Sequence, residues 1–120
     1  MLNAGPKGGL RDRCYRFGLQ VIELTNSLPN KRSAWVIADQ LIRSATSIGA
    51  NITEAKGSGS RLEYKRFFQI ALKSANETYY WLQLLKDSHL SDSVKIEPLL
   101  KEIDEICRML ASSVIKLKQK

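Results

Sequence analysis

The sequence predicts an all-α fold, an antiparallel up-down-up-down four-helix bundle. Three observations favour this fold class. Apolar residues recur at alternating steps of four and three residues in four separate stretches, which is the spacing of helices that pack along one face. The chain holds only three prolines, so long spans of it can be helical. No run of alternating β-branched and polar residues lies between turn residues, as a sheet would require.

The first helix is predicted over residues 10–28, where the apolar stripe consists of Leu10, Cys14, Phe17, Val21, Leu24 and Leu28. Pro29 ends it, because a proline disfavours the helical conformation of the residue before it. Residues 1–9 contain three glycines and one proline. They are therefore predicted to form a flexible N-terminal tail, with the bundle over residues 10–120.

The second helix is predicted to begin at a Ser33 cap and to end near Lys56. Its stripe is predicted to comprise Trp35, Ala38, Leu41, Ala45, Ile48, Ile52 and Ala55. Most of the stripe lies within residues 40–60, the region around which we expect the bundle to be organised. Gly49 costs roughly 1 kcal/mol relative to alanine inside a helix, so we expect close packing against a neighbouring helix there.

The third helix is predicted over residues 61–87, after a turn in which Gly57 caps the preceding helix. Ser58 or Ser60 can cap its start, and Ser60 with Glu63 has the spacing of a capping box. Apolar residues cover much more than one face of this helix. Either the helix is deeply buried or it carries a second interface, and we favour an interface in an oligomer.

A polar linker is predicted over residues 88–94, followed by a fourth helix over residues 95–117. Pro98 is expected in its first turn, where a missing N–H does no harm. The terminal lysines are expected to fray: Lys116, Lys118 and Lys120.

The composition suggests an anionic partner. The formal net charge is +7, from 19 basic and 12 acidic residues, which suits nucleic acid or a membrane surface, although basic residues can also serve solubility alone. The N-terminus holds no apolar run typical of a signal peptide, and no stretch approaches a membrane span. We therefore expect a cytoplasmic protein without a membrane partner.

Motifs for catalysis, metal binding or cofactor binding are absent from the sequence. His89 is the single histidine, and position 86 is a lysine, so the Glu-x-x-His pairs of di-iron bundles are missing. Residues 57–61, GSGSR, lack the lysine and the serine or threonine spacing of a P-loop. Cys14 and Cys107 lie in or beside apolar stripes and are expected to be inert, buried thiols. We expect no enzyme activity and no cofactor.

A line of polar residues runs along the second and third helices. It comprises Ser47, Asn51 and Glu54, beside Arg43, together with Ser74 and Glu77. Such a set either forms a binding site between helices or a hydrogen-bonded network that fixes helix register or a subunit contact. We favour the network or subunit contact.

A group of basic residues surrounds the same two helices, namely Arg43, Lys56, Arg61, Lys65, Arg66 and Lys73. Only Glu54 and Glu63 are acidic within this span, which therefore carries +4. The group is either a surface that contacts the phosphates of nucleic acid or a solvated helix face, and we favour the phosphate-binding surface.

The segment from Leu28 to Leu90 resembles the bacterial four-helix-bundle family of 23S rRNA intervening-sequence proteins. The motifs that carry the resemblance are a proline before the second helix, Q-L-x-R-(S/A)-A-x-S-I-x-A-N-I, an E-(A/G)-x-G turn, E-(Y/F)-x-(R/K)-F and A-x-x-S-x-x-E. Here they are Pro29 and the residues at 40–52, 54–57, 63–67 and 71–77. Lys73 departs from the pattern, since family members usually have glycine there, and residues 53–56 replace the commoner Ala-Glu-Gly.

The resemblance implies a basic homopentamer without known catalysis, whose relatives include accessory proteins of diversity-generating retroelements that bind a reverse transcriptase and nucleic acid. Our leading hypothesis is a non-enzymatic homo-oligomer that binds RNA or DNA through phosphate contacts. The resemblance implies that this oligomer is a pentamer. The alternative is a protein-interaction scaffold, such as an accessory subunit of a reverse transcriptase. Its candidate contacts are the aromatic residues Trp35, Tyr80 and Trp81.

Overall fold

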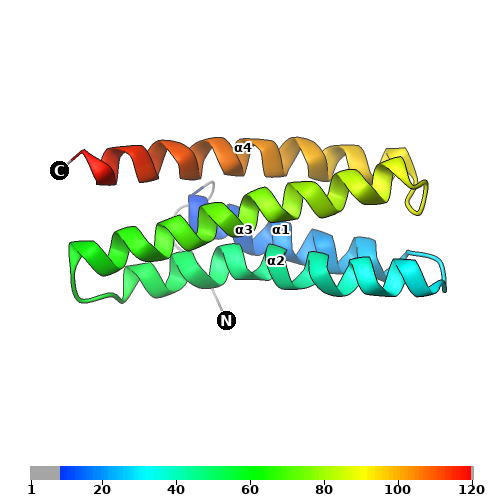
Figure 1. Ribbon diagram of the computed structural model, residues 1–120, viewed down its shortest axis with the longest axis horizontal. Helices are drawn as coiled ribbons and strands as arrows, with labels where there is room; N and C mark the ends of the chain where they lie inside the picture. Colours follow the sequence, from blue (N-terminus) through cyan, green and yellow to red (C-terminus); the bar gives the residue numbers. More distant parts are fainter. Residues whose placement is uncertain (1–8, 120) are drawn as a thin grey trace.

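The computed structural model describes residues 9–119, which form the helices α1 (Leu10–Asn26), α2 (Arg32–Lys56), α3 (Arg61–Asp87) and α4 (Ser93–Lys118). Consecutive helices run in opposite directions along a bundle whose extents are 46 × 30 × 21 Å (Figure 1). This part of the chain contains no strand, and the predicted all-α four-helix bundle is confirmed. Apart from Gly9, the predicted tail lies outside the described residues.

The core lies along the bundle axis and follows the predicted stripes closely. Each helix contributes fully buried side chains, among them Phe17, Leu41, Ile48, Leu82, Ile103 and Leu110. The prediction for the start of α2 was wrong. Trp35 is 58% exposed, and Ala34, which lies one heptad before Leu41, takes the core position instead. No helix between residues 9 and 119 has the length and hydropathy of a membrane span.

The ends of α3 match the prediction. Ser60 Oγ accepts a hydrogen bond from the Glu63 N–H at 3.1 Å, and the Glu63 carboxylate accepts one from the Gly59 N–H at 2.9 Å. At the other end, His89 adopts a left-handed conformation with φ 61°. The N–H groups of His89 and Leu90 then donate to the carbonyls of Lys86 and Leu85, which closes the helix in a Schellman motif.

Two helix starts differ from the prediction. The cap of α2 is Lys31, without a side-chain hydrogen bond, and Ser33 is the second residue of the helix. The cap of α4 is Asp92, whose carboxylate accepts from the Val94 N–H at 3.1 Å, so the helix begins at Ser93. Pro98 is therefore the sixth helical residue rather than a first-turn residue, and α4 loses the hydrogen bond to the Val94 carbonyl.

Gly49 lies against α1, as its position in the sequence suggested. A Cβ at this position would lie 3.5 Å from the Cys14 Cβ and 3.9 Å from the Tyr15 nitrogen. These are ordinary van der Waals distances, so the two backbones approach closely while still leaving room for a methyl group.

Candidate nucleic-acid interface

The ion pairs of residues 9–119 divide the basic residues of the chain into two classes. Arg13, Arg16, Lys86 and Arg108 each pair with a carboxylate at 2.6–3.0 Å. None of these pairs involves the basic group predicted to bind phosphate. The acidic partners in these pairs lie on α1 and α4, whereas the cations predicted around the α2–α3 hairpin lie outside the ion pairs of the described residues.

Three of the predicted residues gather where α2 turns into α3. Lys56 ends α2, Arg61 begins α3, and Lys65 follows one turn later. The Arg61 Nη2 donates to the Leu117 carbonyl at 3.3 Å, which joins this turn to the C-terminal end of α4 (Figure 1).

The same contact brings two further lysines to the turn. Lys116 and Lys118 flank Leu117 in the last turn of α4 and are exposed. The predicted fraying of these two lysines was wrong, since both lie within α4, and the apolar stripe that continues to Leu117 could have placed them at this end of the bundle. We call the five residues the turn-end cluster: Lys56, Arg61, Lys65, Lys116 and Lys118.

The other three predicted residues, Arg43, Arg66 and Lys73, form an outer-face cluster, and all are exposed. Ser44 and Ser74 mark the sides of α2 and α3 that face each other. Arg43 and Lys73 each precede one of these serines, so each is rotated by about 100° from the contact toward solvent. Arg66 lies two turns before Lys73 on the same face of α3. The six predicted residues therefore form two neighbouring clusters rather than one.

Hydroxyl groups join α2 to α3 beneath this outer face. Ser74 Oγ donates to Ser47 Oγ at 2.9 Å, and Ser44 Oγ and Thr78 Oγ1 share a hydrogen bond at 2.9 Å. Asn51 Nδ2 donates to the Ser47 carbonyl at 2.8 Å and to Ser47 Oγ at 3.0 Å. These bonds link fixed positions of the two helices, so they set the register of the hairpin.

The predicted polar set is thus divided. Ser47, Asn51 and Ser74 belong to the network, whereas Glu54 and Glu77 are exposed and lie outside it. Glu77 accepts instead from the Trp81 Nε1 on its own helix at 3.4 Å. The network also includes Ser44 and Thr78, which are 4% and 0% exposed. The predicted polar set did not include these two residues, although their hydroxyls were a visible signal.

The cysteines show the properties of buried, inert thiols. Both are free, Cys14 is buried and Cys107 is half-buried. Burial raises the pKa of the Cys14 thiol to about 12 and that of the Cys107 thiol to about 11. Few thiolates exist at neutral pH under these conditions, and the thiolate is the reactive form.

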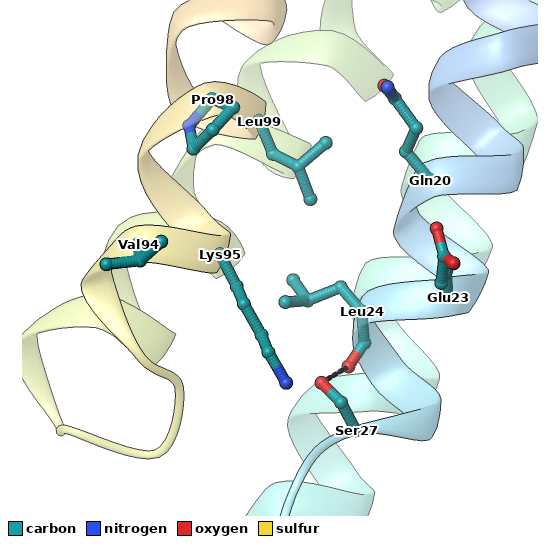
Figure 2. Close-up of a pocket in the computed structure, with 8 residues that line it drawn as sticks. All are labelled: Gln20, Glu23, Leu24, Ser27, Val94, Lys95, Pro98 and Leu99. Carbon is teal, nitrogen blue, oxygen red and sulfur yellow. Dashed lines mark hydrogen bonds between the residues drawn. The ribbon is translucent and has the colours of Figure 1, made fainter.

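A cleft away from these clusters offers no catalytic arrangement. An open cleft of about 410 Å³ lies between α1 and α4 (Figure 2). Its floor is Leu24 and Leu99, and its charged residues are Glu23 and Lys95. The Ser27 hydroxyl donates to the Leu24 carbonyl at 2.7 Å. The cleft therefore lacks a nucleophile with a neighbouring base. Residues 9–119 also contain no group of His, Cys, Asp or Glu side chains that could hold a metal ion.

Comparisons with known proteins identify a family and a similar solved structure. Residues 10–112 match the model of the family described as 23S rRNA-intervening sequence protein. The chain is similar to the crystal structure of a protein with unknown function from the S23 ribosomal protein family of Bacteroides thetaiotaomicron, with 36% sequence identity and a TM-score of 0.82. The similarity covers 88% of this chain and 98% of that one. No curated protein matches the chain.

Proposed function

The chain belongs to the 23S rRNA-intervening sequence protein family, and from this premise we propose that it is a non-enzymatic protein that binds RNA or DNA through phosphate contacts. The binding surface consists of the turn-end and outer-face clusters. One observation carries the proposal: the predicted cations of these clusters lie outside the ion pairs found between residues 9 and 119. Unneutralised lysines and arginines on adjoining surfaces are the usual partners of a phosphate backbone.

A salt series of fluorescence anisotropy with labelled RNA and DNA tests the proposal. The affinity should fall linearly with salt on logarithmic axes, with a slope that counts the phosphate contacts. Replacing Arg61, Lys65 and Arg66 by alanine should reduce that slope by about 2–3 and weaken binding to every sequence. No binding to any strand at low salt would contradict the proposal.

A matched control distinguishes the effect of where the cations lie from the effect of the protein's net charge. Lys95 and Lys101 of α4 and Arg32 of α2 are exposed cations that lie outside both clusters and outside the ion pairs of the described residues. Their replacement by alanine removes the same charge and should change the salt slope by less than 1. Equal losses in the two triple variants would mean that net charge, rather than this surface, governs binding.

An exposed apolar strip supports self-association as part of the same function. Tyr15, Leu19 and Ile22 on α1 are 48%, 52% and 41% exposed. They border a cleft of about 270 Å³ whose floor includes Gly49 and Ala50 of α2. Exposed apolar surface beside a groove of small residues is typical of a contact between proteins. We therefore propose a homo-oligomer, with the pentamer implied by the family resemblance as its expected form.

Sedimentation velocity measures the oligomeric state directly. Leu19→Lys should shift the protein toward monomer, because it buries a charge in the contact. Ile115→Lys on α4, where the side chain is 57% exposed, should leave the oligomer intact. A monomeric wild-type protein at micromolar concentration would rule out the proposed oligomer.

The exposure of Trp35 favours a second candidate function, that of a protein-interaction scaffold such as an accessory subunit of a reverse transcriptase. Its side chain is 58% exposed, and aromatic residues are enriched at the centres of protein interfaces. Binding of a purified reverse transcriptase that survives nuclease treatment and is lost in Trp35→Ala would favour this candidate. Binding that disappears with nuclease would favour a nucleic-acid bridge.

A further inference from the structure

The outer face of α3 carries a row of exposed residues in which cations alternate with apolar and aromatic side chains. The row proceeds in steps of four, four, three, four and three residues through Leu62, Arg66, Ile70, Lys73, Glu77 and Tyr80. Its apolar members are well exposed, with 54% for Leu62, 45% for Ile70 and 57% for Tyr80. The opposite face of the same helix supplies the core, so these side chains are not part of it.

We propose that this row binds single-stranded nucleic acid in preference to a duplex, with phosphates at Arg66 and Lys73 and an unpaired base stacked on Tyr80. The inference rests on the proposed nucleic-acid binding and specifies the form of the ligand. A basic track combined with aromatic side chains is the usual design for binding single strands without sequence preference, because every base offers a face for stacking.

The spacing along α3 suits a single strand that runs parallel to the helix. Arg66, Lys73 and Tyr80 follow one another at intervals of seven residues, which corresponds to about 10.5 Å per interval. Successive members of the series rotate by only about 20° around the helix. Three stacked nucleotides rise by about 10 Å. A strand therefore meets one member of the series every three nucleotides, and about six nucleotides span the series.

The neighbouring helices disfavour a duplex on this face. α3 packs against α2 on one side, through the Ser74–Ser47 contact, and against α4 on the other, through the Lys86–Glu97 ion pair. A helix reads a duplex by entering the major groove, which is only about 12 Å wide. With helices on both flanks, α3 can touch only the phosphates of a duplex. Tyr80 then has no base to stack on.

The aromatic end of the row is held in place from within the helix. The rings of Tyr80 and Trp81 meet edge to face, with centroids 5.0 Å apart and an angle of 73°. Trp81 is half-buried and donates its Nε1 hydrogen to Glu77 at 3.4 Å. Glu77 is the one acidic member of the row. Its carboxylate repels a strand between Lys73 and Tyr80, so stacking on Tyr80 must outweigh that repulsion.

Anisotropy titrations with a labelled 12-nucleotide strand and with its duplex, each over the same salt series, test the inference. The wild-type protein should bind the single strand more tightly. Tyr80→Ala should weaken single-strand binding by about 5- to 100-fold without changing its salt slope, because stacking involves no counterion release. Duplex binding should be unchanged. Tyr79→Ala is the matched control, since Tyr79 is 40% exposed and lies one heptad before Lys86, which pairs with Glu97 of α4. Thermal melts establish that both variants are folded.

The outcomes separate this inference from the proposed function. If Tyr80→Phe, which keeps the ring, binds like the wild type while Tyr80→Ala does not, the stacking role is supported. Equal affinity for single strand and duplex, with Tyr80→Ala neutral, would overturn the inference and leave phosphate binding intact. A loss of single-strand affinity in Tyr79→Ala equal to that in Tyr80→Ala would also overturn it. Absence of binding to either ligand would overturn the proposed function as well.

Discussion

The α1–α4 seam and the α2–α3 seam are held together by different chemistry. Across the first, Arg13 forms a bidentate pair with Glu102 at 2.7 and 2.9 Å and also reaches Glu105 at 2.8 Å. These hydrogen bonds raise the pKa of the Arg13 guanidinium further. Across the second, neutral hydroxyls do the same work through the Ser47–Ser74 and Ser44–Thr78 bonds. The lysines and arginines beside the α2–α3 seam take no part in these hydrogen bonds.

The comparison shows why net charge alone says little about function. Arg13 and Lys73 are equivalent in any count of charge, yet one is bound to two carboxylates and the other is exposed. A cation that joins two helices contributes to folding. A cation that no helix uses is available to a ligand, which is why the α2–α3 hairpin is the better candidate interface.

Arg13→Glu compared with Lys73→Glu should give the largest difference between the two seams. The change at position 13 removes four hydrogen bonds, three to Glu102 and Glu105 and one to Met109 Sδ, and places three carboxylates together. It should lower the free energy of unfolding by about 2–3 kcal/mol, the range for a partly exposed pair after allowance for solvent screening. Lys73→Glu should change it by less than about 0.5 kcal/mol. Urea denaturation measures both, and similar losses would contradict the proposed division of labour.

Thr78→Val tests the hydroxyl contact of the α2–α3 seam. The substitution keeps the shape of the side chain and removes the bond to Ser44, so it should destabilise the fold by about 1–2 kcal/mol. Thr46→Val is the control, because Thr46 and Thr78 both donate to the carbonyl four residues earlier at 2.8 Å. Only Thr78 also bonds across helices. Equal thermal shifts in the two variants would show that the interhelical bond contributes nothing.

Gly49→Ala extends the comparison to the α1–α2 seam, where neither ions nor hydroxyls join the helices around Gly49. The added methyl group meets Cys14 at 3.5 Å, an ordinary contact, and alanine is the better helix former. The variant should therefore be more stable by about 0.5–1 kcal/mol. A lower melting temperature would mean that the seam is tighter than these distances indicate.

The sequence predicted the bundle because the information for each helix is local. The bounds of α3 follow from Ser60, Glu63 and an uninterrupted heptad stripe, all within the segment itself. The start of α4 was misplaced because Asp92 and Pro98 gave competing local signals, and only the cap geometry decides between them.

The candidate interface could be predicted only in part, because pairing is not local. The carboxylate partner of Arg13 lies 89 residues away, and the backbone contact that brings Lys116 and Lys118 to the turn spans 56 residues. The sequence placed Arg61 in the predicted phosphate-binding group but gave no sign that Arg13 is neutralised. The fold separates them, since one is neutralised and the other directs its side chain to the end of α4.

Of these variants, Glu77→Gln should have the smallest effect. It tests most directly whether the ion pairing of a charged residue determines its influence on nucleic-acid binding. Glu77 lies in the α3 row and forms no ion pair within residues 9–119, whereas Glu97 on α4 is paired with Lys86 at 2.6 Å. Each change to glutamine adds one unit of positive charge. If location governs binding, Glu77→Gln should tighten nucleic-acid binding by about 2- to 5-fold, with little change in stability. Glu97→Gln should do less, although it releases Lys86 from its partner. Equal gains in the two variants would mean that the ligand responds to total charge, and the distinction between engaged and available cations would then have no functional meaning.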